Sequence, residues 1–297
     1  MADRYLIINA DDFGMCSASV EAVSALFKNE KSALTSSTVM TPCAWAKSAC
    51  AFAKKNPQFA IGTHLTFTSE WGEYRWAPMS TGDTSTLRDE EGFMWHESVQ
   101  VEKNADLAQV AAEIRAQVER SKQFGLTPSH LDNHMGSLYG IETGRFELLL
   151  TTLDICGEYG LPFRLPRNIS PEQATNTTLE IKIDYDELNA AYSQVIGYAD
   201  AKGVKLPDYL IPNEWDGKTF TGYEDFREYI YELYKSFPNG VTETYMHPAL
   251  DTPELRNITG CWERRVWENR ILSDPATRQH IEANGIKLIN YRDLAKM

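Results

Sequence analysis

The chain has 297 residues, of which 42% are apolar, and this is enough to bury a large core. Its net charge of -13 and pI near 5.0 argue against a nucleic-acid or anionic membrane partner, and favour a small neutral or polar substrate. No apolar stretch approaches the ~20 residues of a membrane span, and the N-terminus lacks the features of a signal peptide, so we expect a soluble, cytoplasmic protein.

The first fifteen residues contain a short apolar run, rich in Ile and Leu, that predicts a buried strand ending in Asp11, Asp12 and Gly14. In a β/α protein the carboxyl ends of the strands face the ligand. Successive side chains alternate between faces, so both carboxylates can face one cavity only if the strand breaks, and Gly14 is placed to make that break. The alternative is that the two Asp are turn residues, one of them capping the helix that begins near Ser17.

Strand and helix patterns alternate along the rest of the chain. Further strands are predicted at 33–41, 60–67, 129–134, 162–166, 208–212, 241–247 and 287–291. Helices are predicted at 17–30, 45–56, 107 to about 125, around 146–153, 185–202, 223–237 and 262–284, the last interrupted at Pro275. The alternation predicts an α/β fold in which a mostly parallel sheet curls into a barrel, in one domain over residues 1–297.

Between the third strand and the next helix lies an irregular aromatic insertion, at about 68–101. Connections this long inside a compact domain are functional lids or disordered segments, and the tryptophans argue against disorder. Trp71, Trp76 and Trp95 are its candidate stacking platforms for a sugar.

Four of the six histidines fall at or near predicted strand ends: His64, His130, His134 and His247. We favour a metal site made of Asp12, His64 and His134, because two imidazoles and one carboxylate with open positions are common in catalytic metal sites. Asp11, beside Asp12, is then the candidate general base.

Two further residues have open alternatives. His130, Asp132 and His134 share one face of a strand at period 2, but a single histidine on such an element is more often a core residue, and we favour that role for His130. Arg164, flanked by prolines, is a candidate to orient a catalytic carboxylate by a charge-assisted hydrogen bond; a surface arginine in a loop is the alternative.

Other chemistries lack a motif. The sequence has no G-x-S-x-G, no G-x-x-x-x-G-K-[ST], no G-x-G-x-x-G and no H-E-x-x-H. The five cysteines are odd in number and far apart, which fits neither a disulfide framework nor a zinc ribbon, and we expect them to be reduced.

Four motifs occur in order: N-A-D-D-F-G at 9–14, G-T-H-L-T at 62–66, P-S-H-L-D-N-H at 128–134 and M-H-P-A at 246–249. With them the sequence resembles the YdjC-like carbohydrate deacetylases, a family that includes chitin-oligosaccharide deacetylases. The resemblance implies a distorted (β/α) barrel related to polysaccharide deacetylases. It also implies a divalent metal, usually magnesium, and removal of acetyl groups from N-acetylated sugars or short oligosaccharides in the cytoplasm.

Matched residue by residue, the resemblance implies that His64, His134 and Asp12 are the metal ligands and that Asp11 is the base. His247 matches a histidine that serves as general acid, and a modest upward shift of its pKa by Asp or Glu neighbours would suffice for that role. Where family members usually have further histidines after H-L-D-x-H, this chain has Met135, Gly136 and Ser137, so we expect a different rim of the pocket.

The sequence leaves alternatives open for the identity of the metal and for the class of function. One carboxylate with two imidazoles suits zinc, iron or manganese better than magnesium, whereas the resemblance favours magnesium. A metal-dependent sugar isomerase or lyase on a similar barrel would use further carboxylates, with Glu214 and Asp216 as the main candidates. A non-catalytic carbohydrate-binding protein would leave the Asp and His set unexplained. A small carbohydrate is the expected partner, and the sequence is compatible with a homodimer.

Overall fold

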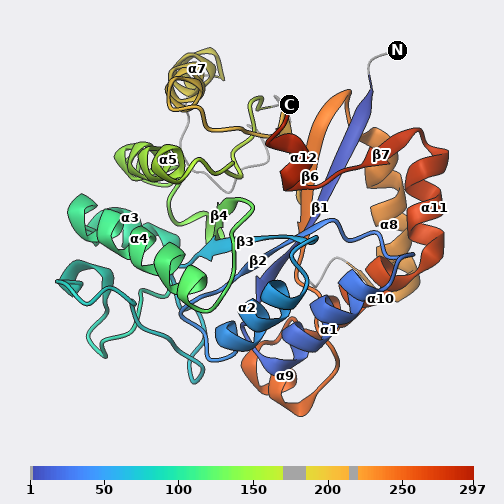
Figure 1. The fold of residues 1–297 in the computed structure, drawn as a ribbon, viewed down its shortest axis with the longest axis horizontal. Coiled ribbons are helices and arrows are strands. Elements are labelled where there is room, and N and C mark those ends of the chain that lie inside the picture. Colours follow the sequence, from blue (N-terminus) through green and yellow to red (C-terminus); the bar gives the residue numbers. More distant parts are fainter. Residues whose placement is uncertain (1–2, 170–184, 214–219) are drawn as a thin grey trace.

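A parallel sheet of seven strands forms the centre of the computed structural model, which describes residues 3–169, 185–213 and 220–297 (Figure 1). The strand order is β4-β3-β2-β1-β6-β5, and β7 also pairs with β1. The strands are β1 (Arg4–Phe13), β2 (Ser36–Val39), β3 (Ala60–Leu65), β4 (Leu131–Asn133), β5 (Tyr209–Leu210), β6 (Gly240–Met246) and β7 (Ile286–Leu288). Because all pairs are parallel, the carboxyl ends of the strands meet at one end of the sheet.

Helices surround the sheet, with α3, α4, α5 and α7 on one side and α8, α10 and α11 on the other (Figure 1). Their bounds are α1 (Ser17–Lys28), α2 (Ala46–Lys55), α3 (Ser98–Asn104), α4 (Leu107–Gln123), α5 (Glu147–Tyr159), α7 (Tyr185–Ala201), α8 (Tyr223–Ser236), α9 (Pro253–Ile258), α10 (Trp262–Ser273), α11 (Pro275–Ala283) and α12 (Tyr291–Leu294). Two single 3₁₀ turns, η1 (Ser85–Leu87) and η2 (His134–Gly136), complete the described elements.

Helix α4 illustrates how the sequence specifies these elements. Its apolar residues Val110, Ile114 and Val118 recur at helical spacing and are fully buried against the sheet. The side chain of Asp106 caps its first turn by accepting hydrogen bonds from two backbone N–H groups.

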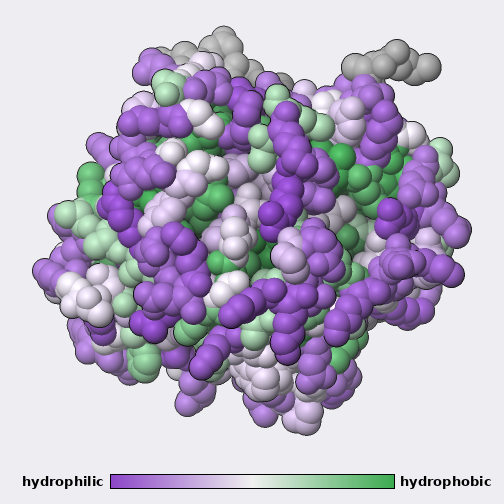
Figure 2. All heavy atoms as spheres, in the orientation of Figure 1, coloured by the Kyte–Doolittle hydropathy of each residue, from purple (hydrophilic) through white to green (hydrophobic). Residues whose placement is uncertain are grey.

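The outer surface is mainly polar. Figure 2 shows hydrophilic residues over most of the visible face, with smaller hydrophobic areas between them. None of the helices in the described part of the chain combines the length and the apolar character needed to cross a membrane.

The sheet closes into the predicted distorted barrel without a regular strand at 162–166. Leu131 N–H donates to the carbonyl of Pro162, and Arg164 N–H donates to the carbonyl of Leu131, at 2.9 and 3.0 Å. On its other side the same segment reaches the residues before β5, with Phe163 N–H donating to Lys205 at 3.0 Å. The strand predicted here is therefore wrong: Pro162 and Pro166 lack the N–H groups that a continuous ladder needs, so a single bridge remains.

The alternation of side chains along β1 separates the core from the site. Leu6 and Ile8 pack into the apolar cluster under the helices. Asn9 and Asp11 face the interior of the barrel, where Asn9 Nδ2 donates to Asp11 Oδ1 at 2.8 Å. Asp12 would face the helices if the strand continued regularly.

A bulge at Asp12 prevents this. Its φ of 59° is left-handed, and the register of β1 against β2 shifts between Ala10 and Phe13, so Asp11 and Asp12 reach the same end of the barrel. The break predicted at Gly14 therefore occurs two residues earlier. Gly14 has φ +90° and a different role, because a Cβ there would lie 3.0 Å from the backbone of Ala46 in α2.

Other boundaries differ locally. Helix α3 begins inside the segment predicted to be irregular and extends three residues beyond it, and the short helix α9 was not predicted. The last strand ends at Leu288 and is followed by α12, whose first turn Asn290 caps. The predicted interruption at Pro275 is confirmed, since α10 ends at Ser273 and α11 begins at the proline.

We predict that Gly62→Ala lowers the free energy of unfolding by about 1–3 kcal/mol, because the added methyl group would meet the backbone oxygen of His130 at 2.4 Å. Urea denaturation measures this difference. The matched control is Gly72→Ala, where nothing lies within 4 Å of the added Cβ and a change below about 0.5 kcal/mol is expected. Equal stabilities of the two variants would contradict the close approach of β3 and β4.

Candidate active site

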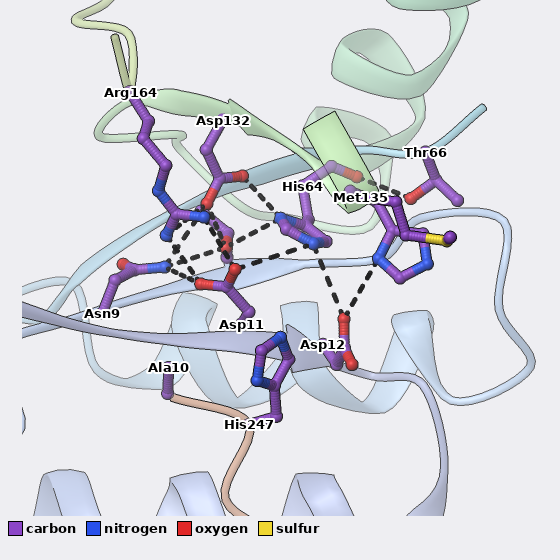
Figure 3. A network of polar contacts seen from close by, with 12 residues as sticks. Asn9, Ala10, Asp11, Asp12, His64, Thr66, Asp132, Met135, Arg164 and His247 are labelled. Carbon is purple, nitrogen blue, oxygen red and sulfur yellow. Dashed lines mark hydrogen bonds and ion pairs between the residues drawn. The ribbon is translucent and has the colours of Figure 1, made fainter. Parts of the chain in front are cut away.

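Three of the predicted residues converge at the carboxyl end of the barrel (Figure 3). Asp12 Oδ1 lies 3.5 Å from His64 Nε2, at the end of β3, and 3.5 Å from His134 Nδ1, just after β4. All three side chains are buried. Neither Asp12 Oδ1 nor His64 Nε2 has a hydrogen-bond partner among the described residues. Buried oxygen and nitrogen atoms that face one another and lack hydrogen-bond partners are the arrangement expected of metal-ligand atoms.

In each of these three side chains, one nitrogen or oxygen faces the other two residues. The remaining nitrogen or oxygen contacts a charged group outside the trio. His64 Nδ1 lies 2.7 Å from Asp132 Oδ1, and His134 Nε2 lies 3.1 Å from Glu70 Oε2. The other oxygen of Asp12 accepts a hydrogen bond of 2.8 Å from Arg265 Nη1, on α10. The orientation of all three candidate ligands is therefore fixed by partners outside the trio.

A second group of possible ligand atoms, from Asp11, His64 and Asp132, is already neutralised. Arg164 donates two hydrogen bonds to Asp11, of 2.7 and 2.6 Å, and its Nη2 lies 2.9 Å from Asp132 Oδ2. A guanidinium cation occupies the place that a metal would need. The trio of Asp12, His64 and His134 is therefore the better metal candidate.

Arg164 lies at the centre of the barrel interior and is only 3% exposed. Its Nε donates to Glu243 Oε1 at 2.8 Å, and the hydroxyl of Tyr291 donates to the other oxygen of Glu243. The structure thus places Arg164 on the carboxylate of the candidate base Asp11, and not in a surface loop.

Burial and charge change the pKa values of this cluster in different directions. Burial would raise the pKa of Asp12, but Arg265 and His134 hold it well below its usual range. For Glu243 burial dominates and raises the pKa to about 7, despite the contact with Arg164. Burial would lower the pKa of His134, yet Glu70 and Asp12 raise it to about 10. The negative charge around His134 thus favours a cation at this position.

His247 lies beside Asp12, at the end of β6 (Figure 3). Burial lowers its pKa and Arg265 acts in the same direction, while Asp12 and Asp11 act in the opposite one, and together they lower the pKa to about 4. The neighbouring carboxylates therefore do not supply the upward shift of the pKa that would suit a general acid, because the loss of solvation outweighs them. The ring is neutral at pH 7, and its backbone N–H donates to Glu268 Oε2 at 2.7 Å.

Of the other predicted residues, His130 and Trp76 are buried in the protein, and two lie outside the described residues. His130 is fully buried and stacks on Tyr291 with ring centroids 3.6 Å apart, so it packs in the core as we favoured. Trp76 is 5% exposed and its indole N–H donates to the carbonyl of Thr68, which makes it a poor stacking platform. Glu214 and Asp216 lie outside the described residues.

Three residues that hold the candidate ligands, Asp132, Glu70 and Arg265, were not predicted to belong to the site. Asp132 shares the period-2 face of His134, and this spacing was a usable signal. Glu70 follows His64 by six positions, and Arg265 lies 253 positions after Asp12, so no local pattern connects either residue with its partner.

Comparison with known proteins finds relatives that match nearly the whole chain. The model of the family described as YdjC-like protein matches residues 5–283. A carbohydrate deacetylase from Enterococcus faecalis is 29% identical over 99% of this chain and 100% of its own length. A carbohydrate deacetylase from Thermoanaerobacter pseudethanolicus is 26% identical over 97% and 98%.

Among solved structures, an Enterococcus faecalis V583 protein whose name assigns it to cellobiose-phosphate cleavage aligns with a TM-score of 0.72. The two chains are 27% identical, and the alignment covers 99% of each. An uncharacterised protein from Agrobacterium tumefaciens C58, with a TM-score of 0.53 and 12% identity, covers 99% of this chain and 90% of its own. The second likeness concerns the fold alone.

We predict that Arg164→Met lowers the free energy of unfolding by about 3–5 kcal/mol, because it leaves the buried carboxylates of Asp11, Asp132 and Glu243 without their shared cation. Denaturant titration measures the loss. Arg167→Met, three residues away, removes an exposed pair with Asp200 and should change stability by about 1 kcal/mol or less. A similar small change in both variants would show that the interior charges are solvated.

Proposed function

The chain belongs to the YdjC-like protein family, and we propose that it is a metal-dependent carbohydrate deacetylase. In this proposal it hydrolyses the acetamide bond of N-acetylated sugars or short oligosaccharides. The observation that carries the proposal is the buried trio of Asp12, His64 and His134 beside the carboxylate of Asp11. The names of full-length relatives at 29% and 26% identity support it.

Asp12, His64 and His134 would hold the metal, since their facing atoms are buried and their remaining atoms are held by other groups. A divalent cation supplies positive charge that polarises an acetyl carbonyl oxygen. The two imidazoles suit zinc, iron or manganese, and the family resemblance favours magnesium. Metal analysis of the purified protein decides between them.

Asp11 is the proposed general base, and its geometry singles out one oxygen. Oδ1 accepts hydrogen bonds from both Asn9 and Arg164. Oδ2 accepts one bond within the described part of the chain, from Arg164, and lies 4.0 Å from His64 Nε2. Oδ2 thus faces the candidate metal-binding residues with a lone pair available. In the proposed mechanism this oxygen accepts the proton of the attacking water.

His247 is the proposed general acid. Because its ring is neutral at pH 7, it has to take up a proton from solvent during turnover before it can protonate the leaving amine, and Asp11 releases to solvent the proton that it accepts from water. Negative charge that develops on the substrate as water adds would raise the pKa of His247, as the carboxylate of Asp12 already does in part. The proton then passes from the imidazole to the amine nitrogen.

Cleavage of a glycosidic bond, which the name of the cellobiose-phosphate relative suggests for that protein, fits this site less well. Glycosidases protonate the leaving oxygen with a carboxylic acid whose pKa is raised. Here the pKa of Asp12 is lowered. Burial raises the pKa values of Glu243 and Glu268 to about 7. However, Glu243 is hydrogen-bonded to Arg164 and Glu268 to the backbone N–H of His247. The surroundings of the site favour amide hydrolysis.

An acetate-release assay tests the proposal. Metal-free protein is incubated with N-acetylglucosamine and its short oligomers, before and after addition of Mg²⁺, Mn²⁺ or Zn²⁺. We expect acetate only after a metal is added, with no new reducing ends from cellobiose phosphate. Absence of acetate with every metal and sugar, or equal release by the metal-free protein, would overturn it.

We predict that Asp11→Asn retains metal but loses about 10²-fold or more in kcat, because the amide keeps the shape of the carboxylate and cannot accept a proton. Steady-state kinetics and metal content are measured together. Unchanged turnover would assign the base role to another residue.

We predict that His247→Ala keeps its metal and slows amide substrates strongly, by about 10²-fold or more, while an activated ester such as nitrophenyl acetate slows much less. The reason is that nitrophenolate leaves without a proton, whereas an amine does not. Equal slowing on both substrates, or loss of metal from the variant, would contradict the acid role.

A further inference from the structure

The side chain of Glu70 lies behind a candidate metal ligand. Its Oε2 is 3.1 Å from His134 Nε2, while the other ring nitrogen of His134, Nδ1, faces Asp12 Oδ1 at 3.5 Å. The two nitrogens of an imidazole point to opposite sides of the ring. Glu70 therefore contacts the nitrogen that is turned away from Asp12.

We propose that Glu70 is a positioning residue for His134, supplied to the site by the aromatic segment that follows β3. The inference rests on the proposed function, in which His134 holds a metal. Nε2–H of His134 donates to the carboxylate of Glu70, which fixes the tautomer with its lone pair on Nδ1 and sets the plane of the ring. Glu70 does for His134 what Asp132 does for His64, whose Nδ1 lies 2.7 Å from that carboxylate.

The backbone before Glu70 is held firmly enough for this role. Ser69 N–H donates to the carbonyl of Trp95 at 2.7 Å, and the carbonyl of Thr68 accepts from the indole of Trp76 at 2.8 Å. Ser69 Oγ also accepts from Arg75 Nε at 3.2 Å. Hence the tryptophans of the segment anchor the chain that carries Glu70.

The position of Glu70 in the chain explains why one segment serves both histidines. His64 lies one residue before the end of β3, and the same buried chain continues through Thr66 and Thr68 to Glu70, six residues after His64. Thr66 is fixed on both sides by Gln117 of α4, whose amide accepts from Thr66 N–H at 2.8 Å and donates to its carbonyl at 2.6 Å. One rigid stretch therefore carries a candidate ligand at its start and the partner of another at its end.

The affinity of the metal-free protein for Mn²⁺ tests the proposal without substrate, with free Mn²⁺ followed by its paramagnetic resonance signal. We expect Glu70→Ala to weaken binding about 10- to 100-fold. Glu70→Gln should fall between Glu70→Ala and the unmodified protein, because the amide oxygen still accepts from Nε2–H. The matched control is Glu73→Gln, which removes the same charge from an exposed position of the same segment and should bind normally.

Two outcomes of the affinity measurement would overturn the proposal. One is an unchanged dissociation constant for Glu70→Ala. The other is equal weakening in Glu70→Gln and Glu70→Ala, which would show that only the charge of Glu70 matters. The visible absorption of the Co²⁺-loaded protein adds a second readout: its intensity should be the same in Glu70→Gln and the unmodified protein, and a change would make Glu70 a direct ligand.

Thermal unfolding of the metal-free variants separates weakened binding from a folding defect. Because Glu70→Ala loses the ion pair with His134, we expect some loss of stability, but the variant should remain fully folded at the temperature of the binding measurement. Acetate release by the unmodified protein is scored separately. If that protein binds Mn²⁺ but releases no acetate, the proposed function fails while the role of Glu70 is still decided by the dissociation constants.

Discussion

The contact of one buried cation with three buried carboxylates is the interaction on which the rest of the structure depends. Arg164 bonds Asp11 from β1, Asp132 from β4 and Glu243 from β6, so one guanidinium connects strands across the whole barrel. Isolated charges could not stay in this interior, because the loss of solvation amounts to several kcal/mol for each ion. Once the planar guanidinium is fixed by the irregular segment that closes the barrel, the directions of Asp11 and Asp132 are fixed as well. Through Asp132, the same cation determines how the ring of His64 is presented to Asp12.

The fold and the central residues of the site could be predicted from the sequence because both follow local rules. Alternating strands and helices predict a parallel sheet, and in a parallel sheet residues at the carboxyl ends of different strands meet. This brings Asp12, His64, His134 and His247 to one end of the barrel. Their partners Glu70 and Arg265 could not be found in this way. Each contacts a residue far away in the sequence, and no helix or strand periodicity relates the two positions. The pKa of His247 was missed for a related reason: the sequence identifies the neighbouring carboxylates but not the depth of burial, and burial decides the sign.

The errors in secondary structure arise from the backbone in one case and from long-range packing in the other, and hydropathy reports neither. Residues 162–166 are apolar enough for a strand, but the prolines supply no N–H groups to a neighbouring strand. The segment at 68–101 lacks a clear period because its aromatic side chains pack in an apolar cluster with residues from other parts of the chain, such as Met15 and Met40. Helix α3 is stabilised by tertiary contacts such as that of Glu102, which accepts hydrogen bonds from Thr143. Long-range packing, and not local propensity, determines these elements.

Backbone strain is concentrated where the site needs side chains that a regular strand would turn away. Among the described residues, the non-glycine positions with a left-handed φ are Asp12, at 59°, and Met135, at 53°. One is a candidate ligand and the other directly follows the candidate ligand His134. Such a conformation costs about 1–3 kcal/mol and persists only when surrounding contacts enforce it. Those contacts are present: Arg265 holds the carboxylate of Asp12, and Ser98 of α3 donates to the carbonyl of Met135 at 2.7 Å. A strand alternates its side chains, whereas a metal needs neighbouring donors on one side. The bulge in β1 and the turn after β4 reconcile the two, and residues from α10 and from the aromatic segment hold them in place.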